Sequence, residues 1–165
     1  MMLAGERTRA VDHLWLKAIH ILAAMFVLGT GLGIAFFMWT AHRTKDPRVI
    51  AAVARNVVLA DAVFTAPGVL GVLLTGILMA ERLGLSLWRG WVGVALALFL
   101  VAGLCWLPVL VLQKAAMRLA ERAHAAGAPL PPPYFRVMRW WFWLGWPAFA
   151  AVIAIAMLMV LKPAP

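Results

Sequence analysis

The sequence predicts an all-α fold, an integral membrane four-helix antiparallel bundle that forms a single membrane domain over residues 1–165. Hydrophobic residues make up 65% of the chain and charged residues 13%, whereas soluble domains have roughly 45–50% and about 25%. A soluble fold could not cover so much apolar surface. Four apolar runs reach the roughly 20 residues that a helix needs to cross a hydrocarbon layer about 30 Å thick. The lipid bilayer is therefore the expected environment of the whole chain.

The four helices follow one another with short connections. The first, about 13–41, is too long and too rich in Gly, Phe and Trp for a cleaved signal peptide. Asp46 and Pro47 then provide an N-cap and a proline at the first helical position, so the second helix is expected over about 47–81. The third helix is expected over about 87–124 and the fourth over about 134–162. A proline-rich linker that can form no helix separates these two.

The net charge of +9 comes from basic residues in short segments beside the apolar runs. That distribution orients a membrane protein and gives no reason to expect nucleic acid as a partner. Two connections on one side hold nine of the basic residues: Arg43, Lys45, Arg48, Arg55, Lys114, Arg118, Arg122, Arg136 and Arg139. The other side holds six: Arg7, Arg9, Lys17, Arg82, Arg89 and Lys162. The positive-inside rule therefore predicts that both termini lie outside the cytoplasm.

Polar groups within membrane helices are costly, so the few in this chain are functional candidates. His20 is the one histidine well inside an apolar run, and Lys17 lies one turn before it on the same helix face. With both termini outside, the outer helix halves also contain Met79, Met157 and Met159. An imidazole and thioethers at one depth suit the axial positions of a b-type haem, or a soft Cu(I) site. Methionine also fills gaps in apolar cores, so simple packing stays open as an interpretation.

Asp61 is the second polar candidate, about one turn inside the cytoplasmic end of the second membrane segment, which is expected from Val57 to Ala80. A carboxylate at that depth needs a partner, because an unpaired charge in low dielectric costs several kcal/mol. Arg55, Arg136 and Arg139 are the arginines that could supply one. We therefore expect Asp61 to form a structural ion pair, in preference to a role in proton transfer.

Several short motifs resemble those of known membrane families. The stretch Trp15–Ile21 (WLKAIHI), followed by a Gly-rich helix that ends in His42, resembles the opening of the HemJ-type protoporphyrinogen oxidases. Thr65–Pro67 with Thr75–Gly76 is similar to the second helix of that family, and Tyr134–Arg136 is similar to its approach to the last helix. The chain is no less similar to the bacterial integral membrane proteins of the DUF2269 family, which share a Leu-Trp-Leu-Lys-x-x-His opening.

The HemJ-type resemblance implies a b-type haem held among the helices and an oxidoreductase that acts on a porphyrinogen. It makes His20 a haem ligand or essential residue, with Lys17 beside it as a catalytic candidate. The leading hypothesis is thus a haem-binding redox protein, a multi-pass protein of the bacterial inner membrane.

Two other functions stay open at this point. The chain could be a non-catalytic subunit or assembly factor that packs against a larger membrane complex or forms a homo-oligomer. Gly29, Gly31 and Gly33 would suit that role, because small residues allow close approach of a helix, as they equally would of a flat macrocycle. The other alternative is a copper-handling membrane protein that uses His20 and the outer methionines.

Overall fold

A computed structural model describes the backbone of residues 2–163 and the side chains of residues 11–163. Its elements are α1 (Met2–Thr44), α2 (Pro47–Ala60), the π-helix η1 (Asp61–Thr65), α3 (Ala66–Arg82), α4 (Gly90–Ala125) and α5 (Pro132–Leu161). Because α2, η1 and α3 follow without a break, they form one span. Within the described range, four helical spans are long and apolar enough to cross a membrane. The predicted all-α membrane bundle is confirmed.

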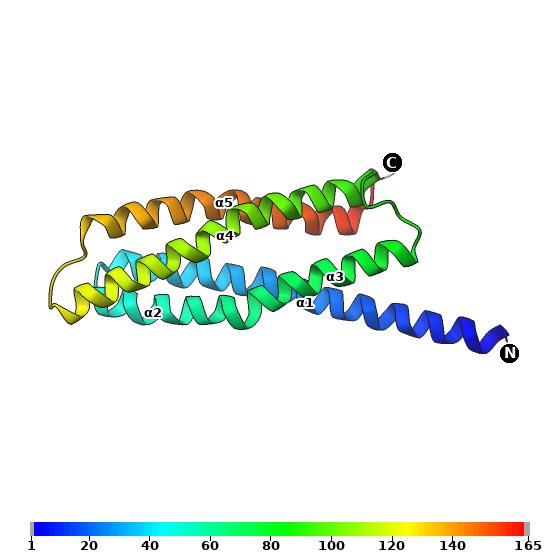
Figure 1. The fold of residues 1–165 in the computed structure, drawn as a ribbon, viewed down its shortest axis with the longest axis horizontal. Coiled ribbons are helices and arrows are strands. Elements are labelled where there is room, and N and C mark those ends of the chain that lie inside the picture. The colour runs from blue at the N-terminus through cyan, green and yellow to red at the C-terminus, as the bar shows by residue number, and fades with distance from the viewer. Residues whose placement is uncertain (1, 164–165) are drawn as a thin grey trace.

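The spans form two antiparallel pairs that meet near one end of the molecule (Figure 1). α1 packs along α3 and α2, α4 packs along α5, and the contact between α2 and α4 joins the two pairs. The α1–α2 and α4–α5 connections lie at this end, which we call the basic end because it carries residues 43–48 and 118–139. The α3–α4 connection lies at the opposite end of the bundle.

The buried core lies in the basic half of the bundle. It combines residues 34–41 of α1, 50–57 of α2, 109–120 of α4 and 130–141 around the start of α5. Ala54, Ala116 and Ala120 have no exposed surface, and such small side chains let α2 and α4 approach closely. Toward the opposite end, α3 has little contact with either α4 or α5. The two helix pairs are therefore held together mainly at the basic end.

Local sequence accounts for the helix ends. Asp46 caps α2 as predicted, since its side chain accepts a hydrogen bond of 2.8 Å from the backbone N–H of Arg48, with Pro47 in the first turn. α4 begins at Gly90, three residues after the predicted start. Ser86 accepts from the N–H of Trp88 in a turn of its own, so it does not cap the helix. α1 begins at Met2, well before the predicted 13.

The π-helix η1 stands directly before the proline of the second span. Ala66 donates its N–H to the carbonyl of Asp61, five residues back, in place of the usual four. Pro67 follows as an early residue of α3. A proline inside a helix has no N–H to donate, and its ring clashes with the carbonyl four residues back. The wider π-turn accommodates that ring within a continuous helix.

Glycines set the contact between α1 and α3. A Cβ added at Gly68 would lie 3.0 Å from Val27 Cγ2 and 3.2 Å from the carbonyl oxygen of Ala23. One at Gly71 would lie 3.1 Å from Ala23 Cβ. A larger side chain at either position would push the two helices apart. This interface positions His20, which lies on α1 one turn from Ala23 and two turns from Val27, toward the opposite end.

We expect Gly68→Leu to lower the unfolding temperature of the purified protein in detergent micelles. Overpacking a close helix contact costs about 1–3 kcal/mol. Gly103→Leu on α4 is the matched control, because a Cβ there meets nothing within 4 Å. Equal unfolding temperatures for the two variants would show that α1 and α3 do not pack as described.

Candidate functional site

His20 is held in one orientation by a hydroxyl of the neighbouring helix. Its Nδ1 lies 2.8 Å from the hydroxyl oxygen of Thr75. That hydroxyl already donates its single proton to the carbonyl of Gly71 in its own helix, so toward the imidazole it can only accept. The proton between the two side chains therefore belongs to Nδ1. In the neutral ring, this leaves a free lone pair on Nε2.

The free nitrogen of His20 is open to the surroundings of α1 and α3. Nε2 forms no hydrogen bond with any described residue. In the described part of the chain, Thr65 Oγ1 is the one fully buried side-chain polar atom without a hydrogen-bond partner. Nε2, which also has no partner, is therefore not fully buried and keeps some accessible surface. The ring packs against Gly76, where an added Cβ would come within 3.3 Å of Cε1. A histidine whose Nδ1 is fixed and whose Nε2 is free is arranged as metal-binding histidines are.

The other predicted ligands lie at different distances from this imidazole. Lys17 is exposed, one turn before His20 on α1. Met79 is partly exposed on α3, one turn beyond Thr75, and so belongs to the helix that His20 contacts. Met157 and Met159 are on α5, which touches α1 over only a short stretch and packs mainly on α4. The structure thus brings Met79 toward the level of His20 on its partner helix but does not bring the α5 methionines there.

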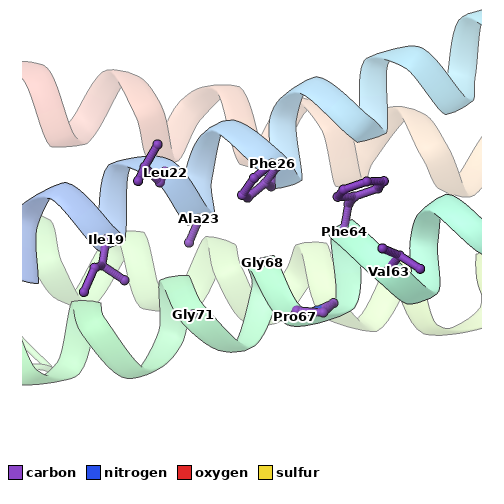
Figure 2. A pocket seen from close by; sticks show the side chains of 9 residues that line it. All are labelled: Ile19, Leu22, Ala23, Phe26, Val63, Phe64, Pro67, Gly68 and Gly71. Atoms are coloured by element: carbon purple, nitrogen blue, oxygen red, sulfur yellow. The ribbon is translucent and has the colours of Figure 1, made fainter.

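An apolar groove runs along the α1–α3 interface beside this histidine (Figure 2). Its volume is about 310 Å³, and it extends from Ile19 and Gly71 toward Phe26 and Phe64. All nine lining residues are apolar: Ile19, Leu22, Ala23, Phe26, Val63, Phe64, Pro67, Gly68 and Gly71. Gly71 accepts the hydrogen bond of Thr75, so the groove ends one helical turn from the imidazole contact. Such a surface suits a largely apolar ligand.

Asp61 is buried and its partner is an amide, not the predicted arginine. The side-chain N–H of Gln113 on α4 donates to Asp61 Oδ2. The indole N–H of Trp141 donates to Gln113 Oε1 over 3.3 Å. Because an indole can only donate, it fixes the oxygen of the amide toward itself and turns the NH₂ group toward the carboxylate. One buried chain of hydrogen bonds thereby joins η1, α4 and α5.

The predicted ion pairing of Asp61 is corrected by this arrangement. Arg55 instead pairs with Glu121 of α4, at 2.8 Å, on an exposed face of α2. Arg136 and Arg139 are exposed on α5. Asp61 faces into the bundle toward α4, whereas these long cationic side chains reach the surface, where their charge stays solvated.

Sequence reasoning missed Gln113, although a signal for it exists. Asp61 lies 14 residues after the start of its span at Pro47, and Gln113 lies 12 residues before the end of α4 at Ala125. Both spans begin or end at the basic end, so these counts place the two side chains at the same depth. Matching polar residues by depth would have indicated the pair.

A second histidine contact lies at the basic end. His42 Nδ1 lies 3.1 Å from the hydroxyl of Tyr134, and their rings stack with centroids 5.6 Å apart. His42 and His20 are 22 residues apart on one helix, about 33 Å at 1.5 Å per residue, so they cannot share a site. Within the described residues, no group of three or more His, Cys, Asp or Glu side chains could hold a metal ion.

We expect Gln113→Leu to destabilise the bundle, because Asp61 and Trp141 would both lose their hydrogen-bond partner. Each buried polar group left unpaired costs about 1–3 kcal/mol. Thermal unfolding in micelles measures the change, and Lys114→Leu at the adjacent exposed position is the control. An unchanged unfolding temperature for Gln113→Leu would mean that the chain of hydrogen bonds contributes nothing to stability.

Comparison with known proteins identifies a family for almost the whole chain. The profile described as "Predicted integral membrane protein (DUF2269)" matches residues 14–163. No curated protein and no solved structure matches the chain. The likeness to the HemJ-type oxidases stays a prediction that depends on the short motifs given above. The match spans all four membrane helices, and the chain therefore belongs to the DUF2269 family of predicted integral membrane proteins.

Proposed function

We propose that the protein is a haem-binding redox protein of the bacterial inner membrane in which His20 would hold the iron of a b-type haem. One observation carries the proposal. The imidazole is fixed through Nδ1 by Thr75 and keeps Nε2 free, at the edge of an apolar groove between two membrane helices. Nitrogen from a neutral imidazole is a common protein ligand of haem iron.

The residues around His20 fit such a group in their chemistry. The iron would supply one-electron chemistry when bound. His20 would hold it, and the bond to Thr75 would keep the ring in its ligating tautomer. The apolar lining of the groove would exclude water from the macrocycle. Met79 would be the thioether best placed to help His20 hold the group, since α3 is the helix that His20 contacts.

The enzymatic form of this function is an oxidoreductase of the protoporphyrinogen oxidase type. Lys17 supports it as the exposed cationic group one turn from His20, where it could hold an acidic substituent of a porphyrinogen. The same imidazole and the Met79 thioether are also the donors that Cu(I) prefers, which makes copper the alternative cofactor.

A non-catalytic subunit or assembly factor is the second candidate, and a separate observation favours it. A Cβ added at Gly29 or Gly33, one turn apart on one face of α1, would meet nothing within 4 Å, so no part of the described chain covers that face of the helix. Small residues on an open helix face allow another membrane helix to pack closely. A subunit of a larger complex, or a second copy of this chain, would fit there.

The proposed orientation puts the basic end in the cytoplasm and both termini outside. Its support is the gathering of the nine basic residues of the two connections toward one end of the bundle, which the positive-inside rule assigns to the cytoplasm. His20 then lies in the outer half of the membrane, on the side away from the cytoplasm.

We expect His20→Ala to abolish the Soret band of the protein purified from membranes. The substitution removes the proposed iron ligand and leaves the hydrophobic spans intact, so the variant should still insert and fold. Absorption spectra and haem content per chain are the measurements. His124→Ala is the matched control, because His124 is exposed at the basic end and should leave the haem content unchanged.

Thr75→Val separates loss of a ligand from loss of structure. It keeps the shape of the side chain and removes the hydroxyl that fixes His20, so we expect haem affinity to fall about 10–100-fold. Full haem content in His20→Ala would refute the haem proposal. Copper without a Soret band in the wild-type protein would favour copper handling, and neither cofactor would favour the subunit.

We expect a cysteine at residue 86 to react with a membrane-impermeant maleimide added to intact cells, and a cysteine at residue 128 to stay unlabelled. Ser86→Cys lies in the connection at the opposite end and Ala128→Cys in the connection at the basic end, both exposed, in a Cys105→Ala background. Permeabilised cells, in which both variants should react, provide the control. Labelling of only residue 128 from outside would reverse the orientation.

A further inference from the structure

The segment Asp61–Thr65 brings together three features that the proposed function does not use. Asp61 and Thr65 are each only 5% exposed. Both lie in the π-helix η1, a kind of irregularity that frequently marks functional sites. Thr65 Oγ1 is the buried side-chain polar atom that has no hydrogen-bond partner in the described part of the chain. We propose that Asp61 and Thr65 bind one univalent cation, sodium, with Gln113 as the residue that positions the carboxylate.

The charge of Asp61 is not balanced by any described side chain. Its one hydrogen-bond partner, Gln113, is a neutral amide. The one ion pair between described residues joins Arg55 to Glu121 on the surface. A carboxylate in a membrane span is stable only when it is paired or neutralised. One negative charge calls for one positive charge, which a univalent ion can provide.

Oxygen atoms without partners are present beside that charge. Gln113 occupies Oδ2 of Asp61 and leaves Oδ1 without a hydrogen bond to any described residue. Oδ1 is not among the buried unpartnered atoms, so it keeps some accessible surface. Thr65 lies one helical turn away in the same short segment. The structure therefore offers a carboxylate oxygen and a hydroxyl oxygen, both uncommitted.

The hydroxyl of Thr65 differs from other threonine hydroxyls of this protein. Thr40, Thr44 and Thr75 each donate to a backbone carbonyl three or four residues back in their own helix. Thr65 makes no such bond, although it is buried. A buried hydroxyl without a partner costs about 1–3 kcal/mol, a cost that a bound ion would remove.

The donor chemistry indicates a hard cation. Carboxylate, hydroxyl and carbonyl oxygens suit hard cations, whereas soft metals prefer sulfur and nitrogen. The described residues include no cluster of carboxylates, histidines or cysteines that a divalent or transition metal would need. The register that sets Val27 against Gly68 and His20 against Thr75 places Thr30 of α1 at the level of Thr65, which adds one more hydroxyl at that depth.

The residues of this site differ from those that would hold the haem, although Val63 and Phe64 of the same segment line the apolar groove. Asp61 and Thr75 are 14 residues apart along one span, about 21 Å at 1.5 Å per residue. No residue named for the sodium site takes part in the hydrogen bond between His20 and Thr75. A failure of either proposal therefore leaves the other untouched.

Labelling with N,N′-dicyclohexylcarbodiimide tests the sodium site. A protonated carboxyl group in the membrane adds across a C=N bond of the reagent, and no leaving group is released. A bound sodium ion blocks this reaction because it displaces the carboxyl proton. The full chain in micelles is treated at one pH in sodium chloride or in choline chloride of equal ionic strength, and the Asp61 peptide is quantified by mass spectrometry. We expect labelling to be about tenfold slower when sodium is at about ten times its Kd.

Variants separate ion binding from a general effect of salt. Asp61→Asn should not be labelled, and Thr65→Val should be labelled but lose the protection by sodium, while the control Thr40→Val keeps it. Equal labelling of the wild type in the two salts would identify the proton as the only neutralising cation and overturn the assignment. No labelling in either salt would show a closed carboxyl, and protection retained in Thr65→Val would remove the hydroxyl from the site. Both results would also contradict the proposal.

Discussion

In a bilayer, a polar group has almost no partner except another group of the same protein, and this constraint shapes the whole molecule. It explains why the described backbone consists of long helices. It also explains the side-chain pairs. Thr75 donates a hydrogen bond to its own helix and accepts one from His20, while Gln113 donates to Asp61 and accepts from Trp141. The bonds of His20 with Thr75 and of Gln113 with Asp61 and Trp141 each cross an interface between two helices. The same bonds that satisfy polar atoms therefore select which helices lie together.

Most of the fold can be predicted from the sequence, because each apolar run must be long enough to cross the bilayer. Four spans, their order and their alternating direction follow from hydropathy and from the shortness of the connections. The start of α2 could also be predicted, since a capping carboxylate and a following proline act within a few residues. Features set by neighbours in the chain were thus accessible, whereas features set by neighbours in space were not.

Asp61 shows why the side-chain contacts between helices could not be predicted from the sequence. Sequence position fixes the depth of a side chain in a span but not the direction in which it leaves the helix axis. An arginine is the stronger partner by charge, so charge alone favoured Arg55, Arg136 or Arg139. The packing of α2 on α4 turns the carboxylate toward Gln113 instead. The bond between His20 and Thr75 likewise depends on the register of α1 against α3, which no local pattern specifies.

The concentration of the core at the basic end has a mechanical consequence. Two long helix pairs that are joined near one end form a lever whose pivot is the packed alanine contact between α2 and α4. A small rotation at that pivot moves the far ends of the pairs through a much larger arc. Because α3 has little contact with α4 or α5 there, a change in the separation of the pairs costs less packing at the opposite end than at the basic end. Lateral pressure in the leaflet around the opposite end acts with the greatest leverage on this part of the molecule.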